Sequence, residues 1–108
     1  ITQTEYCFRN EYPHDGSEDK DVLELQMNVS GGFARGKYNW LPALKDQRKG
    51  VFRGELKDNV MRGEYSFQQE GGAMTVPIEI FLKENEVFVK GGESELGLEA
   101  TIAKVECK

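Results

Sequence analysis

The chain has 108 residues, of which 38% are hydrophobic and 31% charged, as expected for one globular domain spanning 1–108 and not for a disordered chain. Its formal net charge of −5 at pH 7 disfavours sequence-independent binding to nucleic acid. The apolar runs are only a few residues long, whereas a membrane helix needs about 20. Because the chain starts with Ile1 instead of Met, we expect an upstream segment that was removed, either with an export signal or by trimming.

Apolar and polar residues alternate along most of the chain, a pattern that predicts antiparallel strands with one buried face. Residues 23–29 and 33–40 alternate on either side of Gly31-Gly32, a pair that suits a two-residue hairpin turn. Pairing across this turn places Leu25 opposite Tyr38, with the apolar sets of both strands on one face. A slip by one residue would expose one of these sets, so the register is predicted with the turn.

A second hairpin is predicted around Asp58-Asn59. This turn places Arg53 opposite Glu64 and Glu55 opposite Arg62 on the polar face. Two cross-strand pairs of opposite charge from one assumed turn support the hairpin.

Two further turns complete the series. A turn at Gly71-Gly72 would place Phe67 opposite Val76, and a turn at Glu84-Asn85 joins the next two strands. The first strand contains Tyr6 and Phe8, and the last is expected within residues 95–107.

About eight consecutive strands joined by short turns predict an all-β fold, an antiparallel up-and-down barrel or lipocalin-like meander. A β-sandwich with Greek-key connections is the main alternative. The best helix candidate is a short turn over residues 43–48, after Pro42.

The dipeptide Arg-Gly occurs three times, at Arg35-Gly36, Arg53-Gly54 and Arg62-Gly63. The arginines could form a binding stripe, but we favour a plain solvent-exposed face because Glu55 and Glu64 would neutralise two of them. The glycines would lie on the inner face, where they allow a sharp bend or leave room for an internal pocket.

The two cysteines, Cys7 and Cys107, lie in the first and last strands, which closure of a barrel would bring together. We predict a disulfide between them, hence an oxidising compartment, with two free thiols as the alternative. The neighbours of Cys7 indicate that it points outward, whereas Lys104 and Glu106 indicate that Cys107 points inward. A bulge near Ala103 would reconcile the two.

Residues suited to catalysis or to metal binding are few. His14 is the only histidine and is expected in a solvated loop with Asp15. The acidic run 15–21 lacks the spacing of an EF-hand, so we expect a plain acidic loop. The two cysteines do not have the spacing of a zinc site. We therefore predict no enzymatic activity, no cofactor and no metal site.

Aromatic residues remain as the candidate binding residues. Four of them could line one end of the barrel and stack against a small apolar ligand, or could simply fill the core: Tyr38, Trp40, Tyr65 and Phe67. Phe81 and Phe88 form a predicted pair on the outer face. This pair is either a surface for a protein partner or is covered by the last strand or a neighbouring loop.

The order of these features resembles a family of small exported bacterial domains, often lipoproteins, with a lipocalin-like or barrel-like fold and no established activity. The resemblance spans about residues 6–92 and rests on Tyr6-Cys7-Phe8, Leu23-Glu24-Leu25-Gln26, Lys45-Asp46-Gln47-Arg48-Lys49-Gly50, Gly54, Glu64-Tyr65-Ser66-Phe67, Glu70-Gly71 and Ile80-Phe81-Leu82.

This resemblance implies a periplasmic or cell-envelope location, with a membrane contact only through a lipid anchor upstream of Ile1. A looser likeness is to the periplasmic lysozyme inhibitors, small barrels whose ends are joined by a disulfide. We therefore expect a non-enzymatic exported domain that binds a small apolar ligand or an envelope protein. The alternative is a protein inhibitor or an envelope-assembly module.

Overall fold

The computed structural model describes residues 3–69, 71–92 and 98–107. Eight strands follow one another as a closed antiparallel barrel in which each strand pairs with its neighbours in sequence and β1 pairs with β8. The strands are β1 (Thr4–Pro13), β2 (Lys20–Ser30), β3 (Phe33–Leu41), β4 (Arg48–Lys57), β5 (Val60–Gln69), β6 (Gly72–Leu82), β7 (Glu86–Gly91) and β8 (Ala100–Val105). The predicted up-and-down barrel is confirmed, and the sandwich alternative is wrong.

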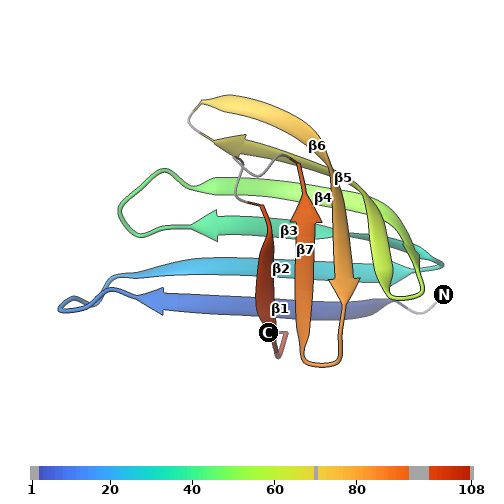
Figure 1. Cartoon of the computed structure of the whole chain (residues 1–108), viewed down its shortest axis with the longest axis horizontal. Helices are drawn as coiled ribbons and strands as arrows, with labels where there is room; N and C mark the ends of the chain where they lie inside the picture. The colour runs from blue at the N-terminus through green and yellow to red at the C-terminus, as the bar shows by residue number, and fades with distance from the viewer. Residues whose placement is uncertain (1–2, 70, 93–97, 108) are drawn as a thin grey trace.

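The barrel is flattened, measuring 46 × 30 × 21 Å. Figure 1 shows β1–β4 side by side, with β7 and β8 lying crosswise over them. β6 is curved (Figure 1): it pairs with β5 from Gly72 to Phe81 and, over Ile78 to Leu82, also with β7, so it joins the two walls. The described part of the chain contains no helix that could cross a membrane.

Three predicted hairpin registers are confirmed. Leu25 pairs with Tyr38 across Gly31-Gly32, and the turns at Asp58-Asn59 and at 84–85 give the expected partners. Both residues of the first two turns have positive φ, between 54° and 82°, as two-residue turns of type I′ require.

The register between β5 and β6 differs from the prediction by two residues. Phe67 pairs with Met74 instead of Val76, because the turn lies one residue earlier and Gly72 is already part of β6. A shift of two residues keeps every side chain on its own face, so alternation alone does not distinguish the two registers.

The predicted helical turn over 43–48 is wrong. Residues 42–47 form an irregular connection, and β4 begins at Arg48. The backbone N–H of Ala43 donates a hydrogen bond of 3.0 Å to the Asp21 carboxylate, which holds this connection against the start of β2.

The predicted disulfide between Cys7 and Cys107 is confirmed, with the two Cα atoms 5.3 Å apart. The bulge near Ala103 is wrong: β8 pairs with β7 in one continuous register, and Cys107 lies beyond the end of the strand. Lys104 was expected to point outward. It lies instead at the open end of the inner face, with its Nζ 5.7 Å from the centre of the Tyr6 ring. The start expected at Glu95 for the last strand lies outside the described residues.

Candidate functional site

The aromatic residues predicted to bind a ligand lie together in the barrel interior. Tyr38 and Tyr65 are fully buried, with ring centres 5.4 Å apart, and Phe67 stacks on Tyr65 at 5.0 Å. Trp40 is half-buried and packs edge-on against Tyr12. These contacts fit the core-filling alternative, and their role toward a ligand stays a prediction.

Hydrogen bonds and one buried cation fix this aromatic cluster. The Tyr38 hydroxyl donates to the carbonyl of Leu98 at 2.7 Å, and the Tyr65 hydroxyl donates to the carbonyl of Tyr38. The guanidinium of Arg48, a residue only 4% exposed, lies 5.1 Å from the centre of the Tyr38 ring. Burial raises the pKa of Tyr38 to about 12 and also raises the pKa of Tyr65, against the opposing effect of the Arg48 charge.

Phe81 and Phe88 pair across β6 and β7 as predicted, with ring centres 5.9 Å apart. Both are half-buried, and the Lys83 ammonium lies 5.8 Å from the Phe88 ring centre. Nothing in these contacts identifies a partner, so the partner surface stays a prediction.

His14 lies in the connection between β1 and β2, as expected. Its side chain contacts Asp21 and not Asp15, with Nε2 2.9 Å from the Asp21 carboxylate. The pKa of Asp21 is lowered, first by the hydrogen bond from the Ala43 N–H and then by His14. The contact between His14 and Asp21 holds the connection between β1 and β2 against the start of β2.

Glu5 lies near the two cysteine sulfurs, close enough for the three residues to hold a metal in principle. The sulfurs are joined in the disulfide, so they are not free thiolate ligands.

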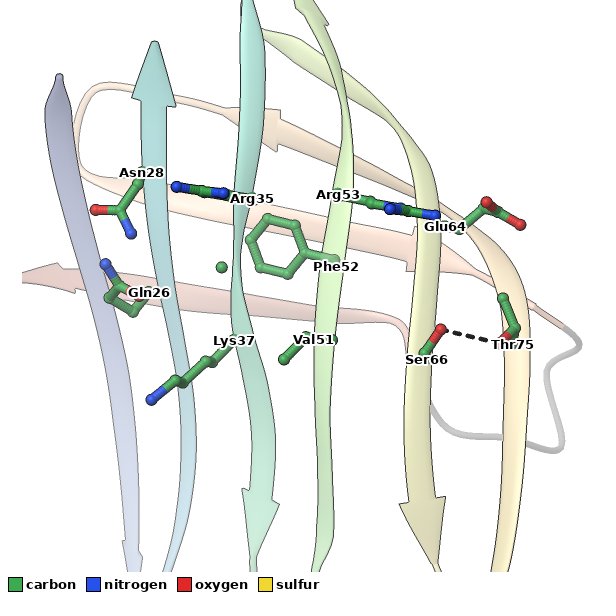
Figure 2. A pocket seen from close by; sticks show the side chains of 11 residues that line it. Gln26, Asn28, Arg35, Lys37, Val51, Phe52, Arg53, Glu64, Ser66 and Thr75 are labelled. Carbon is green, nitrogen blue, oxygen red and sulfur yellow. Dashed lines mark hydrogen bonds between the residues drawn. The ribbon is translucent and has the colours of Figure 1, made fainter. Parts of the chain in front are cut away.

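A hollow on the outer wall is the feature that sequence analysis missed. It has a volume of about 570 Å³ and crosses the outward face of β2–β6. Its floor is formed by Gly36 and the edge of the buried Phe52 ring, and its other lining residues are Gln26, Asn28, Arg35, Lys37, Val51, Arg53, Glu64, Ser66 and Thr75. Figure 2 shows Arg35 and Arg53 turned away from each other, toward Asn28 and Glu64 respectively.

A second hollow of about 400 Å³ adjoins the first and shares Val51, Ser66 and Thr75 with it. It adds Lys49, Gln68 and Met74 to the lining. We call the two hollows together the trough.

The trough is rich in unpaired cations. Its lining includes Arg35, Lys37, Lys49 and Arg53 but only one carboxylate, that of Glu64, so its net charge is +3 in a chain of net charge −5. Within residues 3–69, 71–92 and 98–107, no carboxylate oxygen lies within 4.0 Å of any of these four cations.

Arg35 and Arg53 are direct cross-strand partners, an arrangement that is destabilising for like charges. The predicted neutralisation of Arg53 by Glu64 through an ion pair is wrong. The two residues are cross-strand partners, but their charged groups do not approach within 4.0 Å. Arg62 pairs instead with Glu79 on β6, at 2.9 Å. The three arginines of the Arg-Gly repeats thus differ, since only Arg62 has its charge compensated by an ion pair.

Comparisons of the chain with protein-family models, curated proteins and solved structures found no match. The resemblance to exported lipoprotein domains and to lysozyme inhibitors therefore stays a prediction.

Proposed function

We propose that this protein is a non-enzymatic binding domain of an exported protein, and that the trough binds an anionic ligand. The observation that carries the proposal is the set of four cations around the trough that have no carboxylate partner among the described residues. Elsewhere in the described part of the chain, Arg9, Lys20, Arg62 and Lys83 each have a carboxylate within 4.0 Å, whereas Lys45, Lys57 and Lys90 do not. The trough is therefore distinguished by the clustering of four such cations around one depression.

Arg35 and Arg53 are cross-strand partners whose side chains point in opposite directions (Figure 2), so each guanidinium can contact a separate anionic group of a ligand. A guanidinium offers several N–H donors in a planar fork that matches carboxylate, sulfate and phosphate groups. Arg35 and Arg53, on adjacent strands of a closed barrel, are held at a fixed separation, so little backbone entropy is lost on binding.

The disulfide supports the exported location, because such bonds persist in oxidising compartments. The lipid anchor, the apolar ligand and the inhibitor alternative stay predictions without a supporting contact. Polar and charged side chains outnumber apolar ones in the lining of the trough, where Val51 and Met74 are the exposed large apolar residues. This majority favours an anionic ligand over an apolar one at this place.

The test is retention on immobilised dextran sulfate at low ionic strength, where a chain of net charge −5 without a cationic site should flow through. We expect the wild-type protein to be retained and then released by salt. The double variant Arg35→Gln, Arg53→Gln should flow through.

The double variant Arg62→Gln, Lys90→Gln is the matched control, because it also removes two positive charges, both from residues outside the trough. It should be retained like wild type. A wild-type protein that is not retained, or an equal loss in the control variant, would contradict the proposal.

A further inference from the structure

The outward side chains of the trough form a regular array. Successive register pairs give one row from β2 to β5, Asn28–Arg35–Arg53–Glu64, and one from β2 to β6, Gln26–Lys37–Val51–Ser66–Thr75; Lys49 and Gln68 form a further pair on β4 and β5. All four cations belong to the two central strands, β3 and β4. Amide side chains lie on the β2 side, and hydroxyl and amide side chains lie on the β5 and β6 side.

This arrangement fits a ligand that carries acidic groups on a chain of hydroxyl groups. The cations would meet the acidic groups. Gln26 donates one N–H to the Glu5 carboxylate at 2.8 Å and keeps a second N–H and its carbonyl oxygen for a ligand hydroxyl, and Ser66 can also donate and accept. Ser66 and Thr75 already share a hydrogen bond of 2.9 Å, and each oxygen keeps a further acceptor position toward the trough.

Two other classes of polyanion fit less well. An extended acidic peptide gains affinity by pairing with a free strand edge, and a closed barrel has none along β2–β6. Single-stranded nucleic acid is held by stacking on exposed aromatic rings. The aromatic residues among the described lining are Phe52 and Phe67, which are only 2% and 5% exposed.

We propose that the trough binds a linear acidic polysaccharide, an inference that rests on the proposed anion site. Five strands at about 4.8 Å spacing span about 19 Å, enough for several sugar units. Beside Gln26 and Lys37, a neighbouring hollow is lined by Glu11, Glu24 and Glu106 together with Arg9, whose guanidinium lies within 4.0 Å of the first two carboxylates.

The experiment is isothermal titration of the wild-type protein with galacturonic acid, with its linear oligomers, with neutral dextran oligomers and with poly-glutamate. We expect affinity to rise with the length of the acidic oligosaccharide until the trough is filled. Neutral dextran should not bind, and poly-glutamate should bind at least tenfold more weakly than the galacturonate oligomer of similar charge.

Variants separate the recognition of acidic groups from the recognition of hydroxyl groups. Arg53→Gln should weaken both polyanions about tenfold, as expected for the loss of one charge-assisted hydrogen bond. Gln26→Ala and Ser66→Ala should weaken the oligosaccharide several-fold and leave poly-glutamate unchanged. Arg62→Gln should change neither, and circular dichroism should show the wild-type spectrum for all four.

The outcomes distinguish this inference from the one it rests on. Equal affinity for poly-glutamate, or equal affinity for the monosaccharide and its oligomers, would overturn the polysaccharide while leaving the anion site intact. Failure of every anionic probe to bind would overturn both.

Discussion

The seam between β1 and β8 gives the sharpest test of how this barrel is held closed. Among the described residues, the two strands share two register pairs, Cys7 with Val105 and Phe8 with Lys104, whereas β1 and β2 pair along ten positions. The disulfide at this seam joins residues 100 positions apart. In the chain-entropy treatment, a link that closes a loop of this length stabilises the fold by about 4.7 kcal/mol.

Replacing both cysteines by serine should therefore remove about 4.7 kcal/mol from a total that is about 5–15 kcal/mol for a domain of this kind. With a urea dependence of about 2 kcal/mol per M, the unfolding midpoint should fall by about 2 M. Fluorescence of Trp40, the only tryptophan, reports the transition. Wild-type protein under reducing conditions is the control and should unfold at the same midpoint as the double variant.

A loss below about 1 kcal/mol would refute this reasoning, because the backbone and side-chain contacts of the seam would then hold the ends together unaided. A double variant that is already unfolded without urea would agree with it. In that case the reduced wild-type protein should also be unfolded, and oxidation should restore its structure.

Three further predictions concern single positions. Asn10→Ala should cost about 1–2 kcal/mol and speed amide exchange in β8, because the Asn10 side chain donates to the Thr101 carbonyl at 2.8 Å and accepts from the Ala103 N–H at 3.0 Å. Gly63→Ala should cost about 2–3 kcal/mol in urea unfolding, because its Cβ would lie 1.9 Å from the backbone carbonyl oxygen of Arg53; a cost near zero would contradict the strand spacing. In an alkaline titration followed by tyrosinate absorbance, Tyr38 should ionise near pH 12. The free energy of unfolding should be unchanged below pH 10 and should fall by about 3 kcal/mol between pH 10 and 12, because the folded protein keeps a proton that the unfolded chain releases. Ionisation of all tyrosines near pH 10 without unfolding would contradict that burial.

The fold was predictable from sequence at the two turns in which both residues suit positive φ. Gly31-Gly32 and Asp58-Asn59 both place positive φ at the positions that a type I′ turn requires, and each turn then fixes a whole register. The turn before β6 was misplaced by one residue, because Gly71 and Gly72 both suit a turn and only Gly71 has positive φ, at 78°.

The trough was not predictable in the same way. Its defining pair, Arg35 opposite Arg53, arises from the pairing of β3 with β4, and these strands are joined by residues 42–47 and not by a tight turn. A connection of this kind does not set a register, so no pattern in the sequence placed the two arginines together. Sequence reasoning then assigned Arg53 a neutralising partner in Glu64, which is its register neighbour but not its ion-pair partner.

Gly36 both allows β3 to pack closely against β2 and lines the first hollow of the trough. A Cβ at Gly36 would lie 1.7 Å from the carbonyl oxygen of Gln26 and 2.9 Å from the Phe52 ring, so a side chain here would push β3 away from β2 and from the core. Because Gly36 has no side chain, β3 can lie close to β2 and to the Phe52 ring, and Gly36 and Phe52 both line the hollow. Its neighbours in sequence, Arg35 and Lys37, point outward by alternation and become the rim of the hollow. The tripeptide Arg35-Gly36-Lys37 therefore specifies a depression and its flanking charges at once, which explains how an acidic barrel can carry a cationic site without any loop inserted to build it.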